Sequence, residues 1–392
     1  MPSIAPYALR DYTRGMKGAF VHGLGWAYRH LGAPVFFRWD SEPIHDFFLG
    51  LGWRMGRIPG VAPVMSALLR VSHPSLRVTV AGIAFENPVG LAAGFDHEGK
   101  LPLLVGALGF GFESIGTVTD GAYGGNAYPR LKRLVKSRAI LVNKGFKSSG
   151  MAHVLARLSG QRWRVPIGIS VGRTNTAAHE DHEDAIADIL SALQKAKGSG
   201  VPFSYYELNI SCPNLLKDIS FYEPERFAQL LGALGGLGLD KPLFVKMPIS
   251  LPDAEIDALI DVALRFPVAA LIFGNLQHDR AHPSLDRAEI GPHASHRGNL
   301  SGMPCQARSD ELVARAYRRS AGKIAIIGCG GIFTAADAYR KIRHGASLVQ
   351  LATATIFEGP QIAAELCADL PKLLARDGFT HLSEAVGVDS HA

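Results

Sequence analysis

The sequence predicts an α/β protein, a (β/α)8 TIM barrel preceded by a small N-terminal helical extension. Short apolar runs recur eight times after about residue 77, and helix-like segments lie between several of them. Strands that are buried on both faces read as continuous apolar runs, and their alternation with helices indicates parallel pairing. An open, doubly wound sheet would give the same local pattern and is the alternative architecture.

Residues 1–76 form the predicted extension, and residues 77–392 form the predicted barrel. The extension is aromatic-rich and basic, with little strand signal. Its segment Asp40-Ser41-Glu42-Pro43 has a capping residue followed by a proline in the first turn, which is typical of a helix start. We therefore expect two short helices, whose apolar sides pack on the barrel or lie in a membrane interface.

The barrel strands are expected at the eight apolar runs. These are residues 89–93, 113–118, 167–171, 205–210, 243–247, 269–273, 324–328 and 348–352. The clearest helical segments between them are residues 183–197, 224–234, 253–265, 309–319 and 335–343. Catalytic groups of such barrels lie at the carboxyl ends of the strands, so polar residues that follow these runs are the candidates for a site.

The fourth run ends in a polar turn that carries amides and a thiol, because Asn209 lies at its end and Cys212 and Asn214 follow it closely. An ionised thiol acts as a base or nucleophile, and amides offer donors and acceptors in fixed directions. Asn275 follows the sixth run and adds a third amide, which suits a planar substrate with ring N–H and C=O groups. Taken singly, each residue is explained equally well by an ordinary turn.

Three further features indicate a phosphate-bearing cofactor. The seventh run ends in Gly328-Cys329-Gly330-Gly331-Ile332, a turn that opens a helix and lets backbone N–H groups approach a phosphate. Thr353 follows the eighth run with a hydroxyl. Lys246 lies in an otherwise apolar strand, and a lysine buried there needs an anionic partner or ligand. A side chain that snorkels from the strand end is the alternative for Lys246.

These residues, in this order, resemble the dihydroorotate dehydrogenases, a family of FMN-dependent (β/α)8 enzymes. The matching motifs lie at residues 87–96, 115–119, 129–131, 209–214, 245–246, 299–302, 328–332 and 345–350. Residues 40–45 look like the Asp-Pro-Glu-x-x-His motif of the membrane-associated class 2 enzymes. In that class, two N-terminal helices form a tunnel for a quinone.

The resemblance implies a set of site residues. FMN would be lined by Ala93, Gly94, Thr117, Ser170, Asn209, Lys246, Gly302, Gly330, Gly331 and Thr353. The substrate pyrimidine would be held by His97, Asn143, Asn209, Asn214 and Asn275. Cys212 stands where the family places its catalytic base, and Lys246 would stabilise the reduced flavin.

Some positions depart from the family pattern. Cys212 is usually Ser in class 2 enzymes and Cys in the soluble class 1 enzymes. His97 replaces the lysine of a Gly-x-Asp-Lys motif, so it would hold a substrate carboxylate only when it is protonated. Asn143 is displaced by one position in the Asn-Arg-x-Gly-Phe motif, which reads Val142-Asn143-Lys144-Gly145-Phe146 here. His97 or Lys144 could compensate for the lysine that the Gly-x-Asp-Lys motif lacks.

Two more departures flank the predicted pocket. Leu276 stands where the family has a threonine, and Ala352-Thr353 replaces an aromatic-Ser pair. The changes concern the substrate and the acceptor more than FMN.

The composition limits the possible partners, metals and cellular location. The net charge of +6 is modest and spread over the chain, so no nucleic-acid partner is predicted. The four cysteines form no CxxC pair, and no histidine cluster has zinc-ligand spacing, so no metal is predicted and the compartment is a reducing one. We expect no signal peptide and no spanning helix. The resemblance to the class 2 enzymes implies peripheral attachment, which we expect on the cytoplasmic side of a bacterial cell membrane or its equivalent.

The leading functional prediction is FMN-dependent oxidation of dihydroorotate to orotate in pyrimidine (UMP) biosynthesis, with the electrons passed to a quinone. A second possibility keeps FMN and changes the substrate to a related dihydropyrimidine or cyclic amide, which the residues His97 and Leu276 favour. A third is a non-catalytic paralogue that binds FMN or a pyrimidine. Retention of Cys212, Lys246 and the three Asn residues argues against it.

Overall fold

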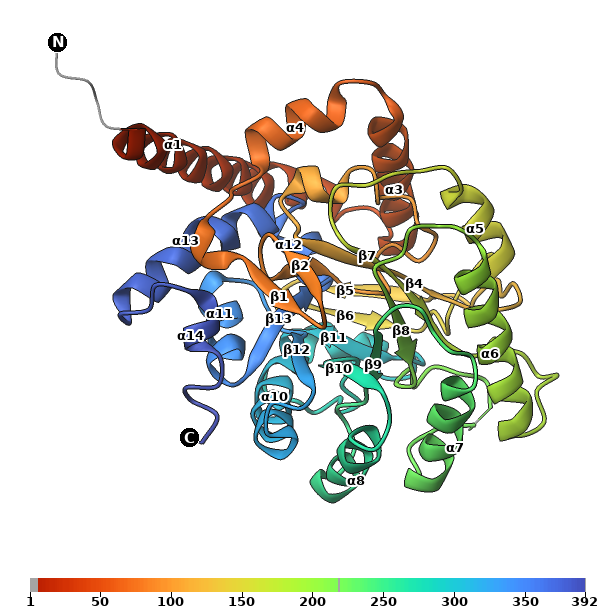
Figure 1. The fold of residues 1–392 in the computed structure, drawn as a ribbon. Helices are drawn as coiled ribbons and strands as arrows, with labels where there is room; N and C mark the ends of the chain where they lie inside the picture. The colour runs from red at the N-terminus through yellow and green to blue at the C-terminus, as the bar shows by residue number, and fades with distance from the viewer. Residues whose placement is uncertain (1–5, 218, 392) are drawn as a thin grey trace, which may run out of the picture.

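The computed structural model describes residues 6–217 and 219–391, and eight of its strands close into a parallel barrel (Figure 1). In chain order these are β3 (Val89–Leu91), β4 (Phe112–Val118), β7 (Ile167–Val171), β8 (Tyr205–Asn209), β9 (Leu243–Met247), β10 (Val268–Phe273), β12 (Ala325–Cys329) and β13 (Ala346–Leu351). Every predicted run contributes one strand. Because β13 pairs with β3, the sheet has no free edge, and the open-sheet alternative is excluded.

Helices surround the barrel (Figure 1). They are α5 (Met151–Leu158), α6 (His182–Gly198), α7 (Pro224–Gly235), α8 (Asp253–Ala263), α9 (Arg287–Ile290), α10 (Gln306–Ser320), α11 (Ala335–Arg343), α12 (Thr353–Glu358), α13 (Ile362–Arg376) and α14 (Leu382–Ala385). All five predicted helical segments are confirmed. The Asp181 carboxylate caps α6, and Thr334 with Asp337 forms a capping box at α11, which fixes where these helices begin.

Large side chains fill the interior of the barrel and separate its two ends. Phe112, Tyr205 and Phe244 belong to this inner core. The antiparallel hairpin of β1 (Val78–Val80) and β2 (Ile83–Phe85) closes the amino end, where the ring of Phe85 lies 5.2 Å from that of Phe112. The open end is therefore the carboxyl end of the strands.

A second sheet lies at that open end. Its strands are β5 (Leu131–Leu134), β6 (Ala139–Val142) and β11 (Asn299–Gly302), paired antiparallel in the order β11-β6-β5. Residues of all three strands line the cavities described below. The sequence pattern predicted none of these strands.

The N-terminal region contains more helix than the two short helices that we expected. It comprises α1 (Pro6–Ala27), a π-helical turn (Tyr28–Gly32), α2 (Ala33–Phe36), α3 (Ser41–Arg57) and α4 (Val61–Leu69). The predicted cap is confirmed, since the Asp40 carboxylate accepts a hydrogen bond from the Glu42 N–H at 3.1 Å and Pro43 lies in the first turn of α3. In the described part of the chain, no helix is both long and apolar enough to cross a membrane.

Ion pairs hold this region against the barrel. Arg29 lies 3.0 Å from a Glu365 oxygen and 3.4 Å from a Glu358 oxygen. The Arg130 guanidinium reaches the Glu42 carboxylate at 2.9 Å, and these side chains are only 6% and 2% exposed. The boundary near residue 76 fits the start of β1 at Val78, but its standing as a domain boundary stays a prediction.

Candidate active site

Polar residues that follow the barrel strands meet in one pocket of about 180 Å³, which we call the amide pocket. Most of the predicted site residues line it: Ala93, Gly94, His97, Thr117, Asn209, Cys212, Asn214, Lys246, Asn275 and Thr353. They come from the ends of β3, β4, β8, β9, β10 and β13, as expected of a barrel whose strands end at one face.

Cys212 brings a thiol into this pocket. Its thiol is partly buried, and this desolvation raises the pKa of Cys212 to about 11. The charges of Arg173 and Lys246 and the Asn214 N–H act in the opposite direction. Cys212 is therefore a thiol in neutral solution and becomes a strong base once it has lost its proton.

Asn209 is fixed in place by hydroxyl groups around it. Its amide donates to Thr117 Oγ1 at 2.7 Å and accepts from the N–H and hydroxyl of Ser211 at 3.1 and 3.0 Å. Thr117 Oγ1 lies 3.1 Å from the Ser170 hydroxyl. Ser170 does not line the amide pocket, so its place is behind Thr117, where it supports the Thr117 side chain.

The other two amides are also held by hydrogen bonds. Asn214 donates to Val142 O at 3.0 Å and accepts from Asn299 Nδ2 at 2.8 Å. Asn275 donates to Ser211 O at 2.9 Å. These bonds hold the side-chain amides in fixed directions, which suits recognition of a planar ring.

Asn143 lies outside the lining of the amide pocket. It is buried, and its Oδ1 accepts a hydrogen bond from Asn126 Nδ2 at 2.9 Å. Its neighbour Lys144 lines the pocket instead. The displacement seen in the sequence motif thus brings a cation, rather than an amide, to this wall.

His97 lines the pocket but does not supply a charge. Burial, and then the nearby charge of Lys144, hold the pKa of His97 well below its usual 6.5. Its Nδ1 has no hydrogen-bond partner among the described residues. His97 is therefore neutral in the unliganded pocket at neutral pH, because burial without a carboxylate partner favours the neutral ring, and its role in substrate binding stays a prediction.

A smaller cavity of about 90 Å³ adjoins the amide pocket and is lined by Gly302, Gly330, Gly331, Lys246 and Thr353. We call it the glycine pocket. Gly330 and Gly331 have left-handed backbones (φ 94° and 67°), as a tight turn requires. We expected this turn to open the helix directly. Instead, Ile332 and Phe333 follow it and pack in the core, and Thr334 then caps α11.

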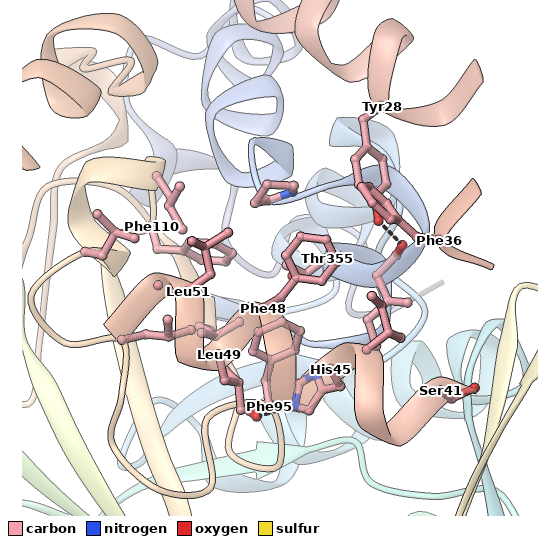
Figure 2. Close-up of a pocket in the computed structure, with 18 of the residues that line it drawn as sticks. Tyr28, Phe36, Ser41, His45, Phe48, Leu49, Leu51, Phe95, Phe110 and Thr355 are labelled. Atoms are coloured by element: carbon pink, nitrogen blue, oxygen red, sulfur yellow. Dashed lines mark hydrogen bonds between the residues drawn. The ribbon is translucent and has the colours of Figure 1, made fainter. Parts of the chain in front are cut away.

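A third, mostly apolar cavity of about 350 Å³ lies between α3 and the barrel (Figure 2). Phe36, Phe48, Leu49 and Phe110 point into it. The Tyr28 hydroxyl donates to Ile356 O at 2.7 Å on one side. The apolar cavity and the amide pocket share five lining residues, which are His45, Phe95, Leu131, Ile140 and Ile356. The two spaces are therefore neighbours.

Comparison with known proteins decides the family. A family model described as dihydroorotate dehydrogenase matches residues 75–374. The chain belongs to the dihydroorotate dehydrogenase family. Members of this family are flavoproteins.

Relatives named dihydroorotate dehydrogenase (quinone) match nearly the full length. The protein of Gloeobacter violaceus is 36% identical, over 91% of this chain and 98% of the relative. That of Natronomonas pharaonis is 37% identical, over 91% and 97%. Among solved structures, the dihydroorotate dehydrogenase of Eimeria tenella in complex with ferulenol superposes with a TM-score of 0.78 and 29% identity, covering 90% of this chain and 96% of that one.

The residues around the dihydroorotate dehydrogenase site that sequence reasoning missed are structural amides. Asn126 donates to Asn214 O at 2.8 Å, and Asn299 holds the Asn214 side chain. Asn299 belongs to a matching motif, so its position carried a signal. Asn126 carried none. Among residues 6–217 and 219–391, no group of three or more His, Cys, Asp or Glu side chains is placed to hold a metal ion.

Proposed function

We propose that this protein oxidises dihydroorotate to orotate in pyrimidine (UMP) biosynthesis, with FMN as its flavin and a quinone as the electron acceptor. The observation that best supports this is the joint arrangement of Cys212, three amides and Lys246 in a pocket beside an apolar cavity. A polar pocket suits the pyrimidine, and an apolar cavity suits the quinone ring and its tail. Membership of the family supports the same assignment.

The residues present fit FMN. Lys246 is 4% exposed, and its ammonium makes no hydrogen bond or ion pair within the described part of the chain, so it calls for an anionic ligand. A Cβ built at Gly94 would meet no atom within 4 Å, which leaves room for a ring against this backbone. Ala93, Thr117, Asn209, Gly302, Gly330, Gly331 and Thr353 would complete the binding site, with Ser170 supporting Thr117.

In the proposed reaction, bound FMN supplies the hydride acceptor for C6 of the substrate. Asn209, Asn214 and Asn275 orient the pyrimidine by its N–H and C=O groups. The Cys212 thiolate removes the proton from C5, so that a C=C bond forms as the hydride leaves C6. Lys246 stabilises the negative charge that develops beside it.

We also propose that the extension meets a membrane. Large apolar side chains are exposed along it, including Phe20 (48%), Trp26 (55%), Trp39 (56%) and Phe47 (60%). Side chains of this kind, next to arginines, are typical of helices that lie in a membrane interface. The proposed location is peripheral, on the cytoplasmic side of a bacterial membrane or its equivalent, where a membrane-dissolved quinone enters the apolar cavity.

The test is flavin bleaching without oxygen. The purified protein should be yellow, should release FMN on denaturation, and should lose its flavin colour on addition of dihydroorotate and regain it on addition of a short-chain quinone. Bleaching by dihydrouracil and not by dihydroorotate would favour the second candidate, a related dihydropyrimidine, which neutral His97 and Leu276 would suit. Flavin that responds to neither compound would leave a non-catalytic binding protein.

A further inference from the structure

Lys144 places a cation in the wall of the amide pocket without an acidic partner. The residue is partly buried, and in the described part of the chain its ammonium forms no hydrogen bond or ion pair. Taking a charge out of water is costly unless a partner compensates it. A lysine held in this way indicates an anionic ligand that completes the site.

The nearest carboxylates are already engaged by other cations. Glu42 binds Arg130 at 2.9 Å and Lys147 at 3.0 Å, and Asp46 lies 3.7 Å from Lys147. The cluster thus contains the cations Arg130, Lys144 and Lys147 and the carboxylates Glu42 and Asp46. One positive charge remains, and Lys144 is the cation without a contact to either carboxylate.

The backbone holds Lys144 in this position. Gly145 and Phe146 both have left-handed backbones (φ 65° and 60°), which turn the chain sharply after Lys144. Asn126 N–H donates to Lys144 O at 3.3 Å, and Asn175 Nδ2 donates to Gly145 O at 3.1 Å. A side chain at Gly145 would collide with Asn126 and Asn175, at 2.5 and 2.7 Å, so the turn is specified locally.

We propose that Lys144 binds the carboxylate of the substrate and thereby selects dihydroorotate over uncharged dihydropyrimidines. This inference rests on the proposed function. It assigns to Lys144 the charge that a lysine at position 97 would carry, while His97 remains a neutral wall of the pocket. An ammonium and a carboxylate enclosed together form a charge-assisted hydrogen bond, which is stronger than a neutral one.

The pH dependence of binding follows from the same group. Burial lowers the pKa of Lys144 to about 8, with Asp46 and Glu42 acting in the opposite direction and Lys147 and Arg130 in the same direction. His45 and His97 also face Lys144, but their pKa values are depressed and both rings are neutral in this range. Affinity for orotate should be constant below pH 8 and fall above it, as the ammonium loses its proton.

The experiment is calorimetric titration of orotate into the yellow holoenzyme, with dihydroorotate bleaching measured in parallel. Lys144→Met should weaken orotate binding about 30-fold to 100-fold, the usual effect of losing a hydrogen bond to a charged group. Dihydrouracil, which lacks the carboxylate, should bind the variant and the wild type equally. Lys144→Arg should retain most of the affinity and lose the fall above pH 8, because arginine stays charged.

Lys100→Met is the matched control. Lys100 lies close enough to depress the pKa of His97 but does not line the amide pocket, so its loss should change orotate affinity less than about threefold. If dihydroorotate bleaches the wild type but Lys144→Met binds orotate as tightly as the wild type does, the inference alone is overturned. Lys144-dependent orotate binding without bleaching would overturn the proposed function alone. A wild type that neither binds orotate nor bleaches would overturn both.

Discussion

The amide pocket and the apolar cavity lie side by side but are built in different ways. The amide pocket is formed mainly by barrel strand ends, with polar groups held by hydrogen bonds to one another. The apolar cavity is formed by the extension and the barrel together, and mainly apolar side chains line it. The barrel thus supplies directional chemistry, while the added helices cover a space that accepts an apolar molecule. Changes in one space should affect one half of the reaction.

The largest expected effect is confined to the amide pocket. Cys212→Ala removes the base, so flavin reduction by dihydroorotate should slow by roughly two to four decades. Reoxidation of chemically reduced flavin by a quinone should keep its normal rate, because the apolar cavity is unchanged. Stopped-flow absorbance measures both steps. Cys367→Ala, which removes a buried thiol from α13, is the control, and near-normal reduction in Cys212→Ala would exclude Cys212 as the base.

The pH dependence of flavin reduction should also distinguish the amide pocket from the apolar cavity. The pKa of Cys212 is raised to about 11, and the thiolate is the active form. Below that pH the thiolate fraction grows about tenfold per pH unit, so the reduction rate at saturating dihydroorotate should rise steadily from pH 7 to 10. Reoxidation by a quinone should not follow this profile. A reduction rate that is flat across the range would contradict the assignment.

The ion pairs between the N-terminal extension and the barrel should contribute to the free energy of unfolding. Glu42→Gln leaves Arg130 and Lys147 without their carboxylate, and removing one partner of a buried ion pair costs about 3 kcal/mol or more. Asp40→Ala at the start of the same helix removes a cap and a partly exposed ion pair with Lys132 (3.4 Å), and should cost about 1 kcal/mol because such exposed pairs contribute little. Urea unfolding measures both free energies. Equal losses for the two variants would mean that the ion pair does not hold the extension.

The smallest expected effect distinguishes side chains that line the apolar cavity from side chains on the outer surface of the extension. Phe48 points into the apolar cavity, whereas the adjacent Phe47 is 60% exposed and does not line it. Phe48→Glu should raise the KM for a quinone about tenfold in detergent, since an apolar contact is replaced by a charge. Phe47→Glu should leave this KM unchanged and weaken binding to liposomes. Identical behaviour of the two variants would remove the distinction.

The sequence predicted the barrel well because its strands are buried on both faces and therefore read as uniform apolar runs. It also predicted which residues follow those strands. It did not predict β5, β6 and β11, because they are short and their pairing joins Val142 to the distant Asn299. The charge of His97 was equally out of reach, since it depends on burial and on Lys144, which the local turn brings to the pocket.

The five residues shared by the two spaces have a thermodynamic consequence. His45, hydrogen-bonded to Phe95 O at 2.9 Å, lines both of them. An occupant of either space that displaces this ring alters the free energy of filling the other, and linkage makes the two effects equal in size and sign. An inhibitor of the apolar cavity that displaces His45 is therefore also an effector of orotate binding, and titrating one ligand in the presence of the other measures that coupling directly.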